Sequence, residues 1–164
     1  MQNICLIIGA GAGVGGNVAK VFADDGYHVY LTRRSDENGL KKLIDTINAS
    51  GGKASGKLMN AIKDNTIEDL IHEIEKDLGP ISVVVYNLGA QIGNKKLEDL
   101  TLKQFDLGLK MGTVGIFRLS KTLFPYMVKG GGGTLIATSS TASVRGNRGQ
   151  HSHAAAMGCL LYTS

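Results

Sequence analysis

The glycine-rich stretch near the start of the chain constrains its fold more than any other feature. In LIIGAGAGVGGNVAKVF, an apolar run typical of a buried strand leads through five glycines into a segment with helical spacing of apolar residues. A strand that turns into a helix within so few residues needs backbone conformations or close approaches that side chains would prevent. The start of such a helix presents free N–H groups and the positive end of its dipole, which predicts a binding site for a pyrophosphate.

Two glycine registers are compatible with this loop. Gly11-x-Gly13-x-x-Gly16 has the ordinary spacing of dinucleotide-binding folds, and Gly9-x-x-x-Gly13-x-Gly15 is the other. A glycine-rich turn without a ligand is the alternative to both. The predicted pyrophosphate-binding residues are Gly9, Gly11, Gly13, Val14 and Gly15.

Short apolar runs alternate with helical segments along the rest of the chain. In one helical segment, Ile67, Leu70, Ile71 and Ile74 share a face. In another, Ser35 is the expected N-cap. This alternation predicts an α/β fold, a Rossmann-like doubly wound parallel sheet with about five strands. The strands are expected at 3–8, 27–32, 54–59, 81–86 and 133–139, and the helices at 15–26, 35–52, 64–80 and about 103–128.

Composition argues against several other classes of protein. The 164 residues carry a net charge of +4, but the basic residues are spread out and aromatic residues are only 5%, which disfavours nucleic-acid binding. The two cysteines form no disulfide framework or metal-binding spacing. Because no apolar stretch is long enough to span a bilayer and no signal segment is evident, we expect a cytoplasmic protein without metal or membrane partner.

The end of the second expected strand indicates which dinucleotide binds. A carboxylate at this position would bind the ribose hydroxyls of NAD, whereas a cation would accept the 2′-phosphate of NADP. The sequence LTRRSD places Arg33 and Arg34 there, with Asp36 following later. The pair favours NADP over NAD, and a solvated surface pair is the alternative.

With these landmarks the chain resembles the short-chain dehydrogenase/reductase family. Gly9, Gly13 and Gly15 stand at the glycine positions of the family's Thr-Gly-x-x-x-Gly-x-Gly motif, with Ile8 in place of the Thr. The sequence YNLG, from Tyr86 to Gly89, stands where the family has Asn-Asn-Ala-Gly, and TSSTASVRG resembles its serine segment.

The resemblance implies an NADP-dependent oxidoreductase that transfers hydride between the cofactor and a small carbonyl or alcohol substrate. It implies that Asn60, in the place of an acidic residue, and Ala61 lie beside the adenine. Asn87 and Gly89 would form the floor of the site. It also implies a homo-oligomer, in which long helices around 97–128 pair between subunits.

The catalytic half departs from the family pattern. The family's Tyr and Lys fall on His153 and Met157, its helix Asn falls on Gly112, and only its Ser is kept, as Ser140. An imidazole exchanges protons near neutral pH, so Ser140 and His153 are the predicted catalytic residues. Weak or absent turnover is expected, and a non-catalytic dinucleotide-binding sensor or interaction module is the alternative.

The last six residues, CLLYTS, match one reading frame of TGTCTCTTATACACATCT, a transposon end used in sequencing libraries. We therefore expect residues 159–164 to be a non-native adapter tail. Residues 1–158 would then form an incomplete NAD(P)-binding domain that lacks the family's last strands and helices.

Overall fold

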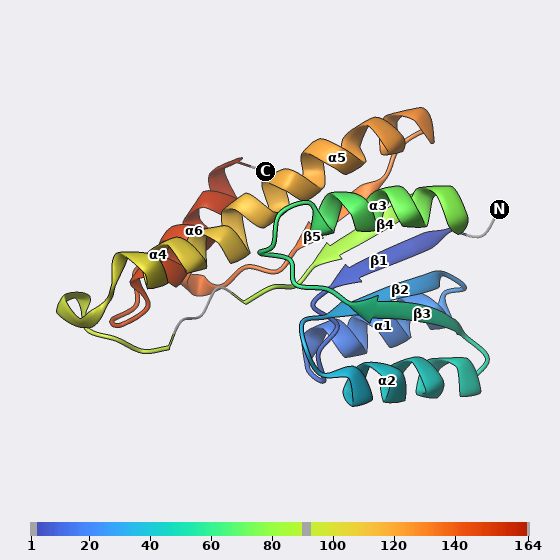
Figure 1. Ribbon diagram of the computed structural model, residues 1–164, viewed down its shortest axis with the longest axis horizontal. Coiled ribbons are helices and arrows are strands. Elements are labelled where there is room, and N and C mark those ends of the chain that lie inside the picture. The colour runs from blue at the N-terminus through green and yellow to red at the C-terminus, as the bar shows by residue number, and fades with distance from the viewer. Residues whose placement is uncertain (1–2, 90–92, 164) are drawn as a thin grey trace.

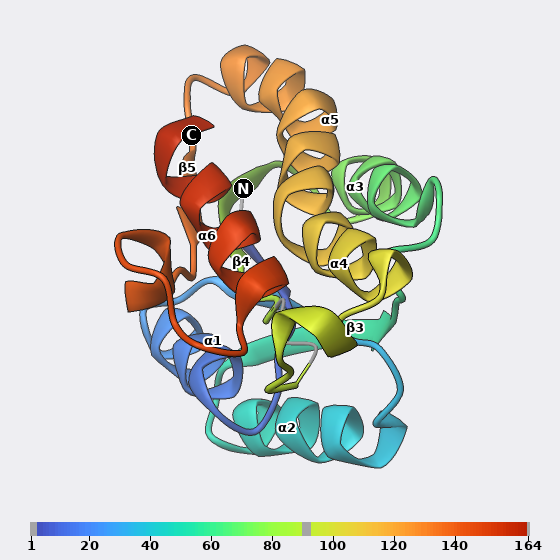
Figure 2. The same ribbon diagram turned by 90° about the vertical axis from the view of Figure 1, so that its left-hand side faces the viewer.

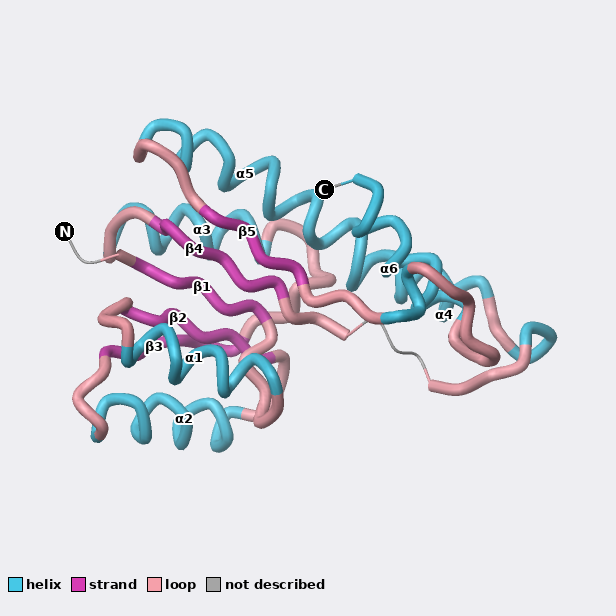
Figure 3. The backbone as a smooth tube through the Cα atoms, turned by 180° about the vertical axis from the view of Figure 1, so that it is seen from behind, coloured by secondary structure: helices cyan, strands magenta, loops and turns pink. Residues whose placement is uncertain are grey.

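The computed structural model describes residues 3–89 and 93–163, and these form a parallel sheet between two layers of helices (Figure 1). The strand order is β3-β2-β1-β4-β5, as the view from behind shows (Figure 3), and every neighbouring pair is parallel. This confirms the predicted α/β doubly wound fold with five strands. The strands are β1 (Ile4–Ile8), β2 (His28–Arg33), β3 (Lys53–Leu58), β4 (Ile81–Tyr86) and β5 (Thr134–Ala137).

Helices cover both faces of the sheet. In Figure 1, α1 (Val14–Asp24) and α2 (Glu37–Ala49) lie below it, while α3 (Thr66–Asp77) and α5 (Gly115–Lys129) lie above it. The helices α4 (Leu102–Leu109) and α6 (His151–Thr163) lie side by side beyond the carboxyl ends of the strands (Figures 1 and 2). Because all neighbouring strands are parallel, the loops that follow β1, β2, β3 and β4 leave the sheet at the same end, at the carboxyl ends of the strands.

The core has two parts, one on each face of the sheet, and side chains of the central strand β1 alternate between them. Every residue of β1 is buried, as expected for a strand with helices on both faces. The predicted apolar face of α3 packs into one part of the core, and burial of each of its four side chains stabilises the fold by about 1.5–3 kcal/mol. These side chains are those of Ile67, Leu70, Ile71 and Ile74.

The start of α2 differs from the expectation. The N-cap is Asp36, not Ser35, and its carboxylate accepts a hydrogen bond of 2.9 Å from the backbone N–H of Gly39. The same carboxylate pairs with Arg33. Ser and Asp are both common N-caps, but only the Asp36 carboxylate can also form an ion pair with Arg33, which favours Asp36 at this position.

The long helix expected over about 103–128 is interrupted. A π-helical turn, Lys110–Val114, joins α4 to α5. The Tyr86 hydroxyl donates a hydrogen bond of 2.5 Å to the Met111 carbonyl in this turn. A Cβ at Gly115 would lie only 1.9 Å from that hydroxyl, so the absence of a side chain there makes room for the contact.

Candidate functional site

Three glycines of the loop, Gly9, Gly15 and Gly16, are required by close backbone contacts, and a Cβ on Gly16 would lie 2.5 Å from the Gly11 carbonyl oxygen. Gly9 has a φ of +93°, and a Cβ on it would lie 2.4 Å from the carbonyl oxygen of Asn87. A Cβ on Gly15 would lie 2.3 Å from the Gly9 carbonyl oxygen, which also accepts a hydrogen bond of 2.9 Å from Asn87 Nδ2. The loop after β1 is thus packed tightly against the loop after β4.

The other two predicted glycines face open space. A Cβ on Gly11 or Gly13 would meet no heavy atom within 4 Å. Gly13 is the N-cap of α1 and has no side chain to occupy the first N–H groups, and Val14, the first residue of the helix, is 59% exposed. An open helix N-terminus of this kind is suited to an anion such as a phosphate.

The two arginines after β2 differ sharply. The Arg33 side chain is 10% exposed, donates from Nε to the Ala10 carbonyl at 2.5 Å and pairs with Asp36. Arg34 is exposed, and no hydrogen bond or ion pair of its side chain is found among the described residues. Arg33 is therefore built into the glycine loop, and Arg34 offers its guanidinium to solvent or to a ligand.

A small cavity lies where these loops meet. It unites residues predicted from three separate stretches of the sequence, the glycine loop, the Arg33–Arg34 pair and the stretch Asn60–Ala61. Leu88 and Met111 also line it. The lining residues are Ile8, Gly9, Thr32, Arg33, Arg34, Met59, Asn60, Ala61, Ile62, Leu88 and Met111. Gly89 is exposed in the loop after β4, outside this lining.

The two predicted catalytic side chains are in contact. Ser140 Oγ forms a hydrogen bond of 3.0 Å with His153 Nε2, whose direction depends on the tautomer of the ring, and it accepts one of 3.3 Å from the backbone N–H of Ala142. His153 is 6% exposed, and its Nδ1 is buried with no hydrogen-bond partner among the described residues. Either tautomer of the neutral ring leaves Nδ1 unpaired, which costs free energy in a buried site.

Burial also decides the charge of this imidazole. It lowers the pKa of His153 below its usual value of 6.5, because the charged ring loses solvation. Met157, one helical turn further along α6, is 2% exposed and belongs to the hydrophobic core. Gly112 is buried within the π-helical turn. The site therefore combines a neutral imidazole and a hydroxyl with an apolar neighbour.

A second, larger hollow includes Ser139, the residue next to Ser140, while Ser140 and His153 line neither cavity. It is an apolar groove of about 810 Å³ between α5, β5 and α6, and Ser139 is among its polar lining residues. Sequence reasoning missed this groove and also missed Met111 in the smaller cavity. No local signal marks Met111, which lies in the π-helical turn and meets the cavity only through the tertiary fold.

The described residues include no group of three metal-ligating side chains that could hold an ion. Within residues 3–89 and 93–163, the structure also contains no helix with the length and apolar character needed to cross a membrane.

Comparison with known proteins gives a consistent result. The family model described as short chain dehydrogenase matches residues 3–160. The 3-oxoacyl-[acyl-carrier-protein] reductase FabG of Thermotoga maritima is 30% identical over 156 residues, which cover 93% of this chain and 61% of that protein. FabG of Escherichia coli K12 is 30% identical over 158 residues, covering 96% and 63% respectively. The chain thus spans about three-fifths of the length of these relatives.

Solved structures share the fold. A short-chain dehydrogenase from Rhodopseudomonas palustris superposes with a TM-score of 0.91 at 27% identity, covering 98% of this chain and 74% of that one. A variant of actinorhodin polyketide ketoreductase, crystallised with NADPH, gives a TM-score of 0.90 at 23% identity, covering 98% and 61%. Because this family model matches almost the whole chain, the chain belongs to the short chain dehydrogenase family.

Proposed function

We propose that the chain binds NADP(H) and serves hydride transfer between this cofactor and a small carbonyl or alcohol substrate. The observation that carries the proposal is the cavity at the carboxyl edge of the sheet. There Gly9 of the glycine loop, the β2 end and the β3 end line one cavity, and the same glycine loop continues into the open N-terminus of α1. In doubly wound folds, ligands bind at this edge.

The residues present fit a dinucleotide. No heavy atom lies within 4 Å of a Cβ built on Gly11 or Gly13, which leaves the first N–H groups of α1, next to Val14, open to a pyrophosphate. Gly9 and Gly15 keep the loop in shape for it. These five residues make up the proposed pyrophosphate site.

The other end of the dinucleotide would lie against the β2 and β3 ends. Arg34, exposed at the cavity, is the residue we assign to the 2′-phosphate, and Arg33 supports the loop beside it. Asn60 and Ala61 would border the adenine. Asn87 would hold the floor through its bond to the glycine loop, with Gly89 beyond it.

The chemistry divides between cofactor and protein. A bound nicotinamide supplies or accepts the hydride. Ser140 Oγ would hydrogen-bond the substrate oxygen. His153 Nε2, 3.0 Å from the Ser140 hydroxyl, would donate a proton toward the substrate oxygen in reduction and accept one in oxidation. Because burial lowers the pKa of His153, little imidazolium is present at neutral pH, so we expect reduction to be slow there and faster at mildly acidic pH.

The test has a binding arm and a turnover arm. Calorimetric titration of the chain with NADPH and NADH measures binding, and NADPH oxidation against a panel of aldehydes and ketones measures turnover. We expect NADPH to bind more tightly than NADH, and turnover to fall in Ser140→Ala and His153→Ala with NADPH affinity unchanged. Absence of heat with both dinucleotides would refute the proposed function.

A non-catalytic dinucleotide-binding module is the second candidate. The buried Met157 and the buried, neutral His153 favour it, because neither supplies a charge at the site. NADPH binding without turnover on any carbonyl would select this candidate over the first.

A further inference from the structure

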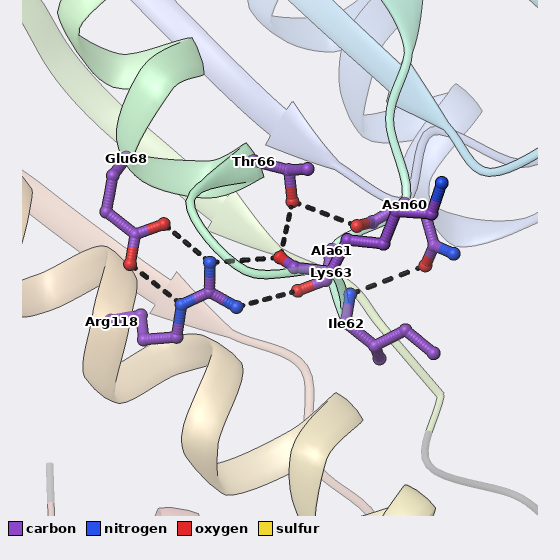
Figure 4. A network of polar contacts seen from close by, with 7 residues as sticks. All are labelled: Asn60, Ala61, Ile62, Lys63, Thr66, Glu68 and Arg118. Carbon is purple, nitrogen blue, oxygen red and sulfur yellow. Dashed lines mark hydrogen bonds and ion pairs between the residues drawn. The ribbon is translucent and has the colours of Figure 1, made fainter.

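A compact ion pair joins the two helices above the sheet, next to the loop that follows β3 (Figure 4). Arg118 of α5 donates from Nε to Glu68 Oε1 of α3 at 2.7 Å and from Nη2 to Glu68 Oε2 at 2.6 Å. Their side chains are only 16% and 26% exposed. A two-pronged contact of this kind fixes the plane of the guanidinium as well as its position.

The remaining donors of this arginine reach the loop itself. Arg118 Nη2 donates to the Lys63 carbonyl at 3.0 Å, and Nη1 donates to the Ala61 carbonyl at 3.5 Å (Figure 4). Thr66 adds contacts from its hydroxyl to the carbonyls of Asn60 and Lys63, each at 2.9 Å. The loop between β3 and α3 is therefore held through its carbonyl groups.

The same loop forms one wall of the cavity described above, with Asn60, Ala61 and Ile62 among the lining residues. Arg118 is not a lining residue. It contacts the loop at backbone carbonyls, while Glu68 holds the guanidinium in place. The hydrogen bond with Arg118 also lowers the pKa of the Glu68 carboxyl, so the pair stays charged at neutral pH.

We propose that Arg118, held by Glu68, is a positioning residue that fixes the loop after β3 in the shape needed to bind the adenosine end of the dinucleotide. This inference rests on the proposed function, since it assigns a role in binding the same cofactor. It concerns only one half of that cofactor, and this makes it separable from a general effect on stability.

The structure offers a matched control for simple helix docking. His72 Nδ1 and the Tyr126 hydroxyl form a hydrogen bond of 2.8 Å that also joins α3 to α5, about one turn further along α3 and two turns further along α5. Neither residue lines the cavity, and within the described part of the chain neither side chain hydrogen-bonds to the loop. Loss of this bond loosens the same pair of helices without touching the carbonyls of the loop.

The experiment compares Arg118→Met, Arg118→Lys, Glu68→Gln and Tyr126→Phe with the unchanged chain. Each is titrated calorimetrically with NADPH, with 2′,5′-ADP as the adenosine half, and with nicotinamide mononucleotide as the other half. We expect Arg118→Met to weaken NADPH and 2′,5′-ADP roughly tenfold, about 1.4 kcal/mol, and to leave nicotinamide mononucleotide unchanged. Arg118→Lys keeps the charge but not the planar fork, so its affinity for 2′,5′-ADP should lie between that of the unchanged chain and that of Arg118→Met.

Thermal unfolding of every variant shows whether it is folded. If Arg118→Met does not fold, Glu68→Gln takes its place in the binding experiment, because it removes the partner that holds the Arg118 guanidinium. Tyr126→Phe should bind all three ligands as the unchanged chain does. Equal weakening by Tyr126→Phe, equal weakening of both halves, or unchanged affinity for 2′,5′-ADP in the Arg118 and Glu68 variants would each overturn the inference. An unchanged chain that binds none of the three ligands would instead refute the proposed function on which it rests.

Discussion

Replacement of Gly15 by Ala tests whether the glycine loop is packed as tightly as its contacts indicate. The new methyl group would lie 2.3 Å from the Gly9 carbonyl oxygen, 2.8 Å from Asn87 Nδ2 and 3.0 Å from the Ala10 Cα. Overpacking of this kind costs about 1–3 kcal/mol. Displacement of Asn87 from its bond to Gly9 adds about 0.5–1.5 kcal/mol. The better helix propensity of Ala offsets at most about 1 kcal/mol.

We therefore expect Gly15→Ala to lower the free energy of unfolding by roughly 0.5–4.5 kcal/mol, as measured by urea unfolding followed by circular dichroism. Gly11→Ala is the matched control, because a Cβ there meets nothing within 4 Å, and its change should stay within about 0.5 kcal/mol. Equal unfolding midpoints for the two variants would refute the packing argument.

Two further predictions concern charged groups. Arg34→Ala should raise the Kd for NADPH about tenfold and leave that for NADH unchanged, because only NADPH carries the 2′-phosphate; titration with both tests this, and equal weakening would contradict the assignment of Arg34. Because burial lowers the pKa of His153 below 6.5, the folded chain binds this proton less readily than the unfolded chain does. The resulting stability is present above pH 6.5 and is lost as the pH falls through the folded-state pKa. His153→Gln should therefore lose less stability than the unchanged chain between pH 7 and pH 5 in unfolding experiments, and parallel pH profiles would contradict this.

Local patterns in the sequence predicted most of the fold, because each depends on residues close together in the chain. The spacing of Ile67, Leu70, Ile71 and Ile74 was enough to identify the buried face of α3. The π-helical turn was not predictable in this way, since apolar residues continue through it at spacings that also suit an uninterrupted helix. Within this turn, the Met111 carbonyl accepts a hydrogen bond from Tyr86, which lies in a strand more than twenty residues earlier in the chain.

The candidate site shows the same division. The glycine loop is a local motif, and the spacing of Ser140 and His153 led to a pair that the structure places 3.0 Å apart. The different surroundings of Arg33 and Arg34 were not evident, because adjacent residues of one type give no indication of which will be buried. Arg118 was missed because its partner Glu68 lies fifty residues away and only helix packing joins them.

The Lys110–Val114 turn holds one residue more than an α-helical turn would. A π-helical hydrogen bond spans five residues where an α-helical one spans four, so the wider turn takes up this residue without displacing the helix on either side. Leu119 and Leu123 therefore stay in the core, and Arg118 stays at its loop. Removal of one residue within this turn should convert it into an α-turn and keep the orientation of α5, whereas removal of one residue between Gly115 and Arg118 would rotate the rest of the helix by about 100°.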